Sequence, residues 1–252
     1  MSTLVVKDLC KIYESRYGKN KYQALENVSF TVEKGDYIAV MGESGSGKTT
    51  LLNMIAGLDN ITSGSVLLEG MDLKDIGDSK MAKFRRENLG FVFQDFSLLD
   101  FFTLKDNILL PTVLRGENHK KSVEKMMKIA EMLEIDELLD KYPYEVSGGQ
   151  KQRAAVARAV IVDPKLLLAD EPTGALDSRA TENLLDIFDI LNKQGQTIFM
   201  VTHSVKAACR AGQLLFIKDG HLHDKLIKTE NMSDKEFEKV ILDYLSGQGI
   251  EG

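Results

Sequence analysis

Residues 42 to 49 of this 252-residue chain read Gly42-Glu43-Ser44-Gly45-Ser46-Gly47-Lys48-Thr49. The two outer glycines, followed by lysine and threonine, match the spacing of a phosphate-binding loop without a mismatch. A short apolar run, 36–41, comes before this stretch, and an apolar segment with helical character, 49–56, follows it. Strand, glycine-rich loop and helix form half of a β-α-β unit, so the stretch predicts an α/β fold with a P-loop.

The loop offers the groups that bind a polyphosphate. Its glycines let successive backbone N–H groups turn toward the β-phosphate, and the helix that follows adds the partial positive charge of its N-terminus. We expect Lys48 to reach the β and γ oxygens and Thr49 to hold Mg²⁺ through its hydroxyl. The predicted ligands are therefore ATP and Mg²⁺, and the predicted nucleotide-binding residues of this segment are Gly42, Ser44, Gly45, Ser46, Gly47, Lys48, Thr49 and Thr50.

The composition is that of an ordinary globular protein. Hydrophobic residues make up 43% and charged residues 28% of the chain, which argues against collagen-like, disordered and low-complexity classes. Thirty-two Lys and Arg against 38 Asp and Glu give a net charge of -6, which counts against nucleic acid as a partner. No apolar stretch reaches the ~18 residues of a membrane-spanning helix, and the first residues do not resemble a signal peptide. We expect a cytosolic chain in which Cys10 and Cys209 stay thiols.

The order of elements fits an α/β chain with additions. Alternating apolar and polar residues in 27–33 are typical of a half-exposed antiparallel sheet, whereas several later apolar runs suit parallel strands covered on both faces. A mostly helical insert is expected at about 95–158, and a short helix that begins near Ser233 is expected in the tail. The predicted strands are 3–7, 27–33, 36–41, 65–69, 89–93, 166–169, 197–201 and 213–217.

Two acidic residues follow the apolar strand predicted at 166–169. Asp170 is placed to bind Mg²⁺ through water, as the acidic partner that a P-loop requires. Glu171 comes next, and its carboxylate can orient or deprotonate the water that attacks the γ-phosphate. The sequence therefore predicts hydrolysis of ATP in addition to its binding.

A third motif reads Val146-Ser147-Gly148-Gly149-Gln150 and opens an alanine-rich helix. Here the sequence resembles the ATP-binding-cassette (ABC) superfamily, whose signature is Leu-Ser-Gly-Gly-Gln ahead of the acidic strand, with Val146 in place of leucine. Ser147 and Gly149 offer a second anion site at a helix N-terminus. The resemblance implies that residues Ser147, Gly148, Gly149 and Gln150 cap the γ-phosphate of ATP bound to a second copy, so that a head-to-tail homodimer encloses two ATP molecules.

Two further positions follow predicted strands. Gln94, after 89–93, corresponds in this resemblance to the glutamine that contacts Mg²⁺ or water and senses the membrane partner. His203, after 197–201, corresponds to the histidine that hydrogen-bonds to the γ-phosphate and positions Glu171, although Ser204 replaces the aspartate often found next. The resemblance thus implies Lys48, Gln94, Glu171 and His203 as catalytic residues and Thr49, Gln94 and Asp170 as metal ligands.

The remaining correspondences concern the dimer and the adenine. Asp177, in Ala175-Leu176-Asp177, matches the loop that couples the two sites of a dimer. Tyr13 corresponds to the aromatic residue that stacks on adenine, with Tyr17 and Tyr22 as rivals. The resemblance covers about residues 3–224, with the helical subdomain at 95–158, and leaves 225–252 as a C-terminal extension.

Residues 169–178 resemble the ABC ATPases that serve FtsX-type permeases, and 41–53, 90–100 and 106–111 are similar to the Bce-type members that confer bacitracin and lantibiotic resistance. The resemblance implies an ATPase at the cytoplasmic face of the membrane, peripheral through its permease, which protects against antimicrobial peptides. It leaves open a sensor histidine kinase in the complex. Lipoprotein release, macrolide export and FtsX-type regulation of cell-wall hydrolases in cell division remain alternatives.

The second hypothesis belongs to another functional class. It is a cassette protein that has no permease and acts on cytosolic machinery, such as DNA repair or translation. Such relatives usually carry a long coiled-coil insertion or two fused cassettes. The sequence has neither pattern, and its acidity argues against duplex or ribosome binding.

Overall fold

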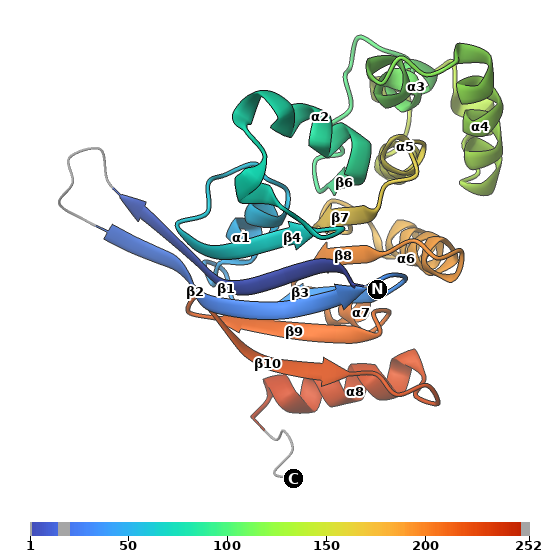
Figure 1. Ribbon diagram of the computed structural model, residues 1–252. Coiled ribbons are helices and arrows are strands. Elements are labelled where there is room, and N and C mark those ends of the chain that lie inside the picture. The colour runs from blue at the N-terminus through green and yellow to red at the C-terminus, as the bar shows by residue number, and fades with distance from the viewer. Residues whose placement is uncertain (1, 15–20, 248–252) are drawn as a thin grey trace. The chain divides into compact units, whose positions relative to one another are not determined.

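The computed structural model describes residues 2–14 and 21–247. Figure 1 shows the helices and strands of the chain in sequence colours. The chain divides into two compact units, the first made of Met1–Gly77 and Thr197–Gly252 and the second of Asp78–Gln196. Parallel strands, an antiparallel sheet and helices together confirm the predicted α/β class. The predicted boundary at residue 224 stays a prediction.

An antiparallel sheet occupies the amino-terminal part of the first unit. Its four strands lie in the order β2-β1-β4-β5, where β1 is Ser2–Glu14, β2 is Lys21–Glu33, β4 is Ser63–Leu68 and β5 is Met71–Asp72. Val28 and Val32 are fully buried while their neighbours at 29 and 31 are exposed, as the alternation in the sequence predicted. The predicted strand 65–69 belongs to this antiparallel sheet, and β1 and β2 are longer than expected because they continue past the apolar alternation as a paired ribbon.

Parallel strands form the other part of the first unit. Strand β3 (Tyr37–Met41) pairs in parallel with β8 (Ile198–Val201) and with β9 (Gln213–Lys218). Every residue of β3 and β8 is buried, which agrees with the uninterrupted apolar runs. Strand β10 (His221–Ile227) pairs antiparallel with β9, and its polar sequence gave no sign of a strand. The helices of this unit are α1 (Lys48–Ile55), α7 (Val205–Ala208) and α8 (Asp234–Leu245), with a 3₁₀ turn at Leu73–Asp75.

The second unit combines a parallel strand pair with helices. Strands β6 (Leu89–Phe93) and β7 (Leu166–Asp170) run in parallel, with Phe93 opposite Asp170. Helix α5 (Gly148–Val160) packs closely because Ala154, Ala155 and Ala157 are fully buried and small. Three α-helices and the loops that join them lie between β6 and β7, and the predicted helical subdomain at about 95–158 stays a prediction. The helices are α2 (Asp78–Asn88), α3 (Leu104–Leu114), α4 (His119–Met132), α5 (Gly148–Val160) and α6 (Ser178–Lys193), with 3₁₀ turns at Asp136–Leu138 and Pro143–Glu145.

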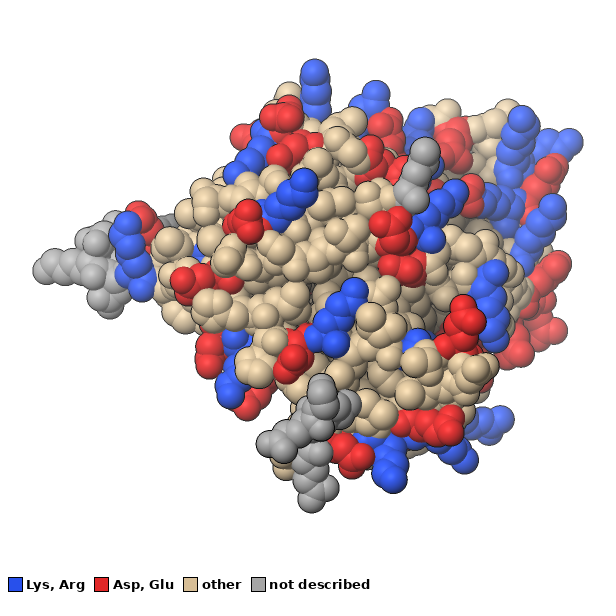
Figure 2. All heavy atoms as spheres, turned by 60° about the horizontal axis from the view of Figure 1, so that its bottom comes forward, with Lys and Arg blue, Asp and Glu red and all other residues tan. Residues whose placement is uncertain are grey.

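The surface mixes both signs of charge. On the face drawn in Figure 2, the acidic and basic side chains of the described residues are interspersed, and no broad basic area gathers there. Both cysteines, Cys10 and Cys209, are free thiols. Within the described ranges, no helix combines the length and the apolar character that crossing a membrane requires.

Candidate nucleotide site

The predicted phosphate loop connects β3 to α1 in the first unit. Gly45 and Gly47 have φ values of +81° and +106°, which favour glycine. Gly42 is required for a different reason, because a Cβ there would lie 2.1 Å from the carbonyl oxygen of Ile217. A Cβ at Gly47 would lie 2.5 Å from the carbonyl oxygen of Ala24. Close packing and backbone conformation therefore both fix glycines in this loop.

The loop has the donors that a phosphate group needs. Gly47 is the N-cap of α1 and offers no side chain to satisfy the first N–H groups of the helix. The hydroxyl of Ser46 is buried, and no hydrogen-bond partner is found for it among the described residues. Lys48 Nζ donates to the carbonyl oxygens of Gly42 and Glu43, at 2.8 Å each, so the ammonium group lies against the loop. These features fit a bound polyphosphate.

His203 lies at the same end of the parallel strands as the loop. The N–H of Thr202 donates to the carbonyl of Val40 at 3.0 Å, which aligns the end of β8 with the end of β3. His203 then follows as an exposed residue, and it lines a cavity of about 520 Å³ together with Gly42 and Glu43. The structure thus brings the predicted histidine and the phosphate loop together.

Tyr13 and Tyr22 are cross-strand partners in β1 and β2. The Tyr13 hydroxyl donates to Asp59 Oδ2 at 2.8 Å, and Lys11 Nζ lies 4.6 Å from the centre of the Tyr13 ring. Burial first, and then the hydrogen bond to Asp59, raise the pKa of Tyr13, while a hydrogen bond with Thr50 in α1 acts in the opposite direction.

Tyr22, the described alternative to Tyr13 for stacking on adenine, is placed differently. Tyr22 donates to the carbonyl of Gly45 at 3.3 Å, and its side chain is 59% exposed against 39% for Tyr13. Both described tyrosines therefore lie near the phosphate loop, and Tyr17 lies outside the described residues. The choice of Tyr13 stays a prediction.

The predicted acidic residues and Gln94 meet in the second unit. Because Phe93 is opposite Asp170 in the parallel pair, Gln94 and Glu171 leave neighbouring strand ends. Glu171 has a φ of +46°, an uncommon conformation for a residue other than glycine, which turns the chain sharply after β7. A Cβ at Gly174 would lie 2.8 Å from Gln94 Nε2, so the turn after Glu171 packs directly against the Gln94 amide.

The signature residues and Asp177 line one cavity, of about 310 Å³, in the second unit. Ser147 is the N-cap of α5 and forms a capping box with Gln150, while Asp177 is the N-cap of α6 and accepts from the N–H of Ala180 at 2.8 Å. Gly149 allows the close approach of these helices, because its Cβ would lie 3.0 Å from that of Ala180. Arg153 Nε lies at this cavity without a hydrogen-bond partner among the described residues, which fits an anion.

The predicted metal ligands have the chemistry of a magnesium site. Among the described residues, no group of three or more His, Cys, Asp or Glu could form a protein cage for a metal ion. Mg²⁺ is usually held by one or two carboxylates, waters and substrate phosphates. Asp170, in the second unit, offers such a carboxylate, while Thr49, in the first unit, offers a hydroxyl and Gln94, in the second, an amide oxygen. All three remain predictions.

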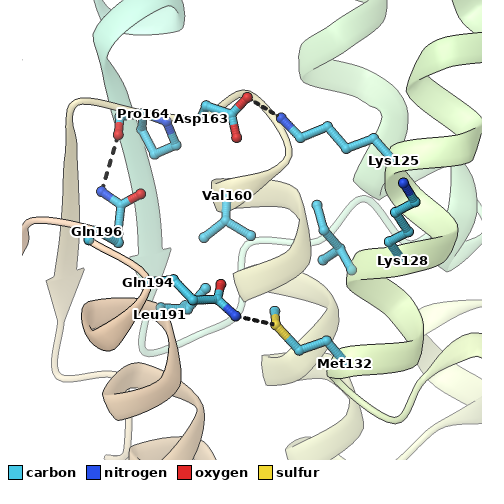
Figure 3. A pocket seen from close by; sticks show the side chains of 11 residues that line it. Lys125, Lys128, Met132, Val160, Asp163, Pro164, Leu191, Gln194 and Gln196 are labelled. Atoms are coloured by element: carbon cyan, nitrogen blue, oxygen red, sulfur yellow. Dashed lines mark hydrogen bonds and ion pairs between the residues drawn. The ribbon is translucent and has the colours of Figure 1, made fainter.

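Another cavity, of about 480 Å³, lies between α4, α5 and α6 (Figure 3). An ion pair between Lys125 and Asp163 closes one side, and Gln194 Nε2 approaches Met132 Sδ at 3.8 Å on the other. None of the predicted nucleotide-binding or catalytic residues lines this cavity. It is therefore separate from the groups described above.

The ABC transporter family model matches residues 25–174, which include the phosphate loop, Gln94, the signature and both acidic residues. The chain belongs to the ABC transporter family. It is the ATP-binding subunit of such a transporter and an ATPase, as the order of its motifs indicated.

Relatives of known name agree with this family. The chain is 48% identical to the ABC transporter ATP-binding protein YxdL of Bacillus subtilis over 247 residues, covering 98% of this chain and 94% of YxdL. It is 42% identical to the bacitracin export ATP-binding protein BceA of Halalkalibacterium halodurans over 253 residues, covering 100% of this chain and 98% of BceA. A dimeric structure of the ATP-binding cassette MJ0796 in a post-hydrolysis state, bound to ADP and Pi, is similar with a TM-score of 0.81 and 33% identity, covering 89% of this chain and 98% of that one.

Some of the residues found at these sites were not among those predicted from the sequence. Lys11 and Asp59 form an ion pair at 2.8 Å beneath Tyr13, although they are 48 residues apart. Gln152 and Arg158 of α5 bind carbonyl groups on either side of Gln94. Only Gln152 and Arg158 carried a readable signal, since both stand in an alanine-rich helix whose neighbours are mostly buried.

Proposed function

We propose that this chain hydrolyses ATP to drive an FtsX-type membrane permease that protects the cell envelope from antimicrobial peptides such as bacitracin or lantibiotics. In this proposal two copies enclose two ATP molecules, and the pair docks beneath the permease at the cytoplasmic face of the membrane. A sensor histidine kinase is a further candidate member of the complex.

The phosphate loop supports the first part of the proposal. Its backbone N–H groups and Lys48 bind the phosphates of ATP, and Tyr13 stacks on the adenine. Ser147 to Gln150 of the second copy cap the γ-phosphate, and Asp177 couples the two sites. Thr49, Gln94 and, through water, Asp170 would hold Mg²⁺, which would supply neutralising charge for the phosphates.

The carboxylate of Glu171 carries the hydrolytic step. In this proposal Glu171 accepts a proton from the water that attacks the γ-phosphate, and His203 hydrogen-bonds to the γ-phosphate. ATP binding closes the dimer, and hydrolysis with product release opens it again. The region around Gln94 would transmit the opening and closing of the dimer to the permease.

The observation that carries the substrate class is the match to BceA, which covers 100% of this chain and 98% of BceA. The geometry of a nucleotide site alone selects no cargo, because one fold can serve many different functions. The mixed charge on the face in Figure 2 also gives no support to a nucleic-acid partner.

The experiment is affinity purification of the tagged chain from membranes, followed by identification of the bound membrane protein. A large permease with a broad extracellular domain supports the proposal, and a small four-span partner would instead indicate control of cell-wall hydrolases. Loss of the gene should sensitise the cell to bacitracin or a lantibiotic, and a Glu171→Gln copy should fail to restore resistance. Sensitisation to macrolides alone would indicate macrolide export.

A further inference from the structure

Helix α5 contains a glutamine whose amide lies between two segments of the candidate site. Gln152 is fully buried, and its Nε2 donates to the carbonyl of Phe93 at 3.1 Å and to the carbonyl of Pro172 at 2.7 Å. Phe93 directly precedes Gln94, and Pro172 directly follows Glu171. One side chain therefore joins the backbone next to each of these two site residues.

An arginine of the same helix holds the other side of the Gln94 segment. Arg158 donates from Nη2 to the carbonyl of Phe96 at 3.0 Å and from Nη1 to the carbonyl of Ser97. Burial lowers the pKa of the Arg158 guanidinium, although the nearby Asp95 carboxylate acts in the opposite direction. Arg158 thus donates to these two carbonyl groups even though its burial disfavours the charged guanidinium.

The segment that Arg158 holds is strained. Phe96 and Ser97 have consecutive φ values of +64° and +47°, and neither residue is a glycine. Left-handed conformations of such residues persist where the surrounding structure over-determines them. The two hydrogen bonds from Arg158 provide that restraint just beyond Gln94.

We propose that Gln152 and Arg158 form a carbonyl clamp that makes the signature helix move as one piece with Gln94 and Glu171. The helix starts at Ser147 and is continuous through both clamp residues, so a displacement of the Gln94 segment would be transmitted to the signature. Gln152 and Arg158 are positioning residues in this account. The inference rests on the proposed function, because it takes the roles of Gln94, Glu171 and Ser147 from there.

Stability alone does not explain an amide at position 152. Gln152 Oε1 is buried, and no partner for it is found among the described residues. A buried acceptor without a partner is costly, and an apolar side chain of similar shape would avoid that cost. The two bonds from Nε2 are therefore the feature that the apolar residue could not supply.

The test is Gln152→Met in the full chain, because methionine has a similar shape and no donor. We expect a Tm close to that of the wild type, because removal of the unpartnered Oε1 offsets the loss of the two bonds from Nε2. We also expect a KM for ATP within about 2-fold and a kcat lower by about 10-fold or more, since small misplacements of catalytic groups have effects of this size. Gln194→Met, the same change at the exposed C-cap residue of α6, whose amide approaches Met132, is the control and should leave kcat unchanged. Arg158→Lys keeps one cationic donor and should retain more activity than Arg158→Met.

The wild type and Glu171→Gln are measured in the same assay. If Glu171→Gln is inactive while Gln152→Met turns over at the wild-type rate, the proposed function stands and the clamp is overturned. A Gln152→Met variant whose KM and kcat change together with a lowered Tm would show a purely structural role and would also overturn it. If Glu171→Gln hydrolyses ATP normally, the proposed function itself fails.

Discussion

Single glycines decide whether the phosphate loop can form. Gly42 is the tightest of the loop positions, because its Cβ would lie 2.1 Å from the backbone oxygen of Ile217 in β9. That oxygen belongs to a strand paired with β3, so it cannot move aside without disturbing the sheet. The motif spacing in the sequence marked these glycines as part of a phosphate loop. The neighbouring strand β9, whose backbone requires a glycine at position 42, is visible only in the fold.

Gly42→Ala should therefore destabilise the protein and weaken ATP binding. Overpacking of this kind costs about 1–3 kcal/mol, which lowers the Tm by several degrees in a chain of this length. Gly77→Ala is the matched control, because nothing lies within 4 Å of its Cβ. Thermal unfolding and titration calorimetry with ATP measure both effects, and equal Tm values for the two variants would show that the contact with Ile217 is easily relieved.

The ion pair beneath Tyr13 predicts a dependence of stability on pH. Burial by itself raises the pKa of Asp59, but hydrogen bonds from Lys11, Tyr13 and the N–H of Asn60 outweigh it, so the pKa lies below the ordinary value of 3.8. A lowered pKa stabilises the folded state while the carboxylate is ionised. This contribution is present above pH 3.8 and is lost as the pH falls through the folded-state pKa.

Asp59→Asn should lower the Tm at pH 7 and make the further loss of Tm below pH 4 shallower than in the wild type. The measurement is thermal unfolding between pH 7 and pH 2.5, with Asp140→Asn, an exposed aspartate of the second unit, as the control. Parallel pH curves for the wild type and Asp59→Asn would mean that this carboxylate is not specially stabilised.

Helix α8 shows what patterns can and cannot predict at the scale of an element. Ser233 and Glu236 form the expected capping box, and Phe237 and Ile241 are fully buried on the expected face. The contacts of its C-terminal end with the neighbouring strands were not predictable. Tyr244 donates to Asp224 Oδ2 at 2.6 Å and stacks on Phe216, and Asp224 belongs to β10, a polar strand that the sequence did not reveal.

The same contrast applies to α5. Its residue types predicted the helix, and the signature marked its start. Gln152, Ala155, Val156 and Ala159 lie at helical spacing on one buried face, so the position of Gln152 carried a signal. Its acceptors did not, because Phe93 and Pro172 come near it only through the parallel pairing of β6 with β7.

The Tyr244 cluster predicts how α8 responds to alkaline pH. Burial first, and then the hydrogen bond to Asp224, raise the pKa of Tyr244 to about 12. The unfolded chain loses this proton near pH 10 while the folded chain keeps it, so stability is complete below pH 10 and falls as the pH rises toward 12.

Tyr244→Phe should thus be less stable than the wild type at pH 7 and should lose less additional stability between pH 10 and pH 12. Urea unfolding at a series of pH values measures this, and Tyr144→Phe, at a tyrosine that is 68% exposed, is the control. A Tyr244→Phe curve that follows the wild type over the alkaline range would contradict the role of this hydroxyl.

On the scale of the whole molecule, the two units carry different parts of the proposed machinery. The phosphate loop and His203 belong to the first unit, and Gln94, Glu171 and the signature belong to the second. The sequence predicted these parts because each is a contiguous motif next to a recognisable strand or helix. The permease, its cargo and the pairing of two copies depend on other chains, so one sequence indicates them only through resemblance.

The central claim is that Glu171 carries the hydrolysis of ATP by this chain. The most direct test measures ATP binding and turnover on the same sample of Glu171→Gln. The account predicts that calorimetry shows ATP binding close to that of the wild type while the rate of phosphate release falls by about 10²-fold or more, the scale of lost general-base catalysis. Lys48→Ala, as the contrasting variant, should lose tight ATP binding instead. A Glu171→Gln protein that hydrolyses ATP at the wild-type rate would contradict the account.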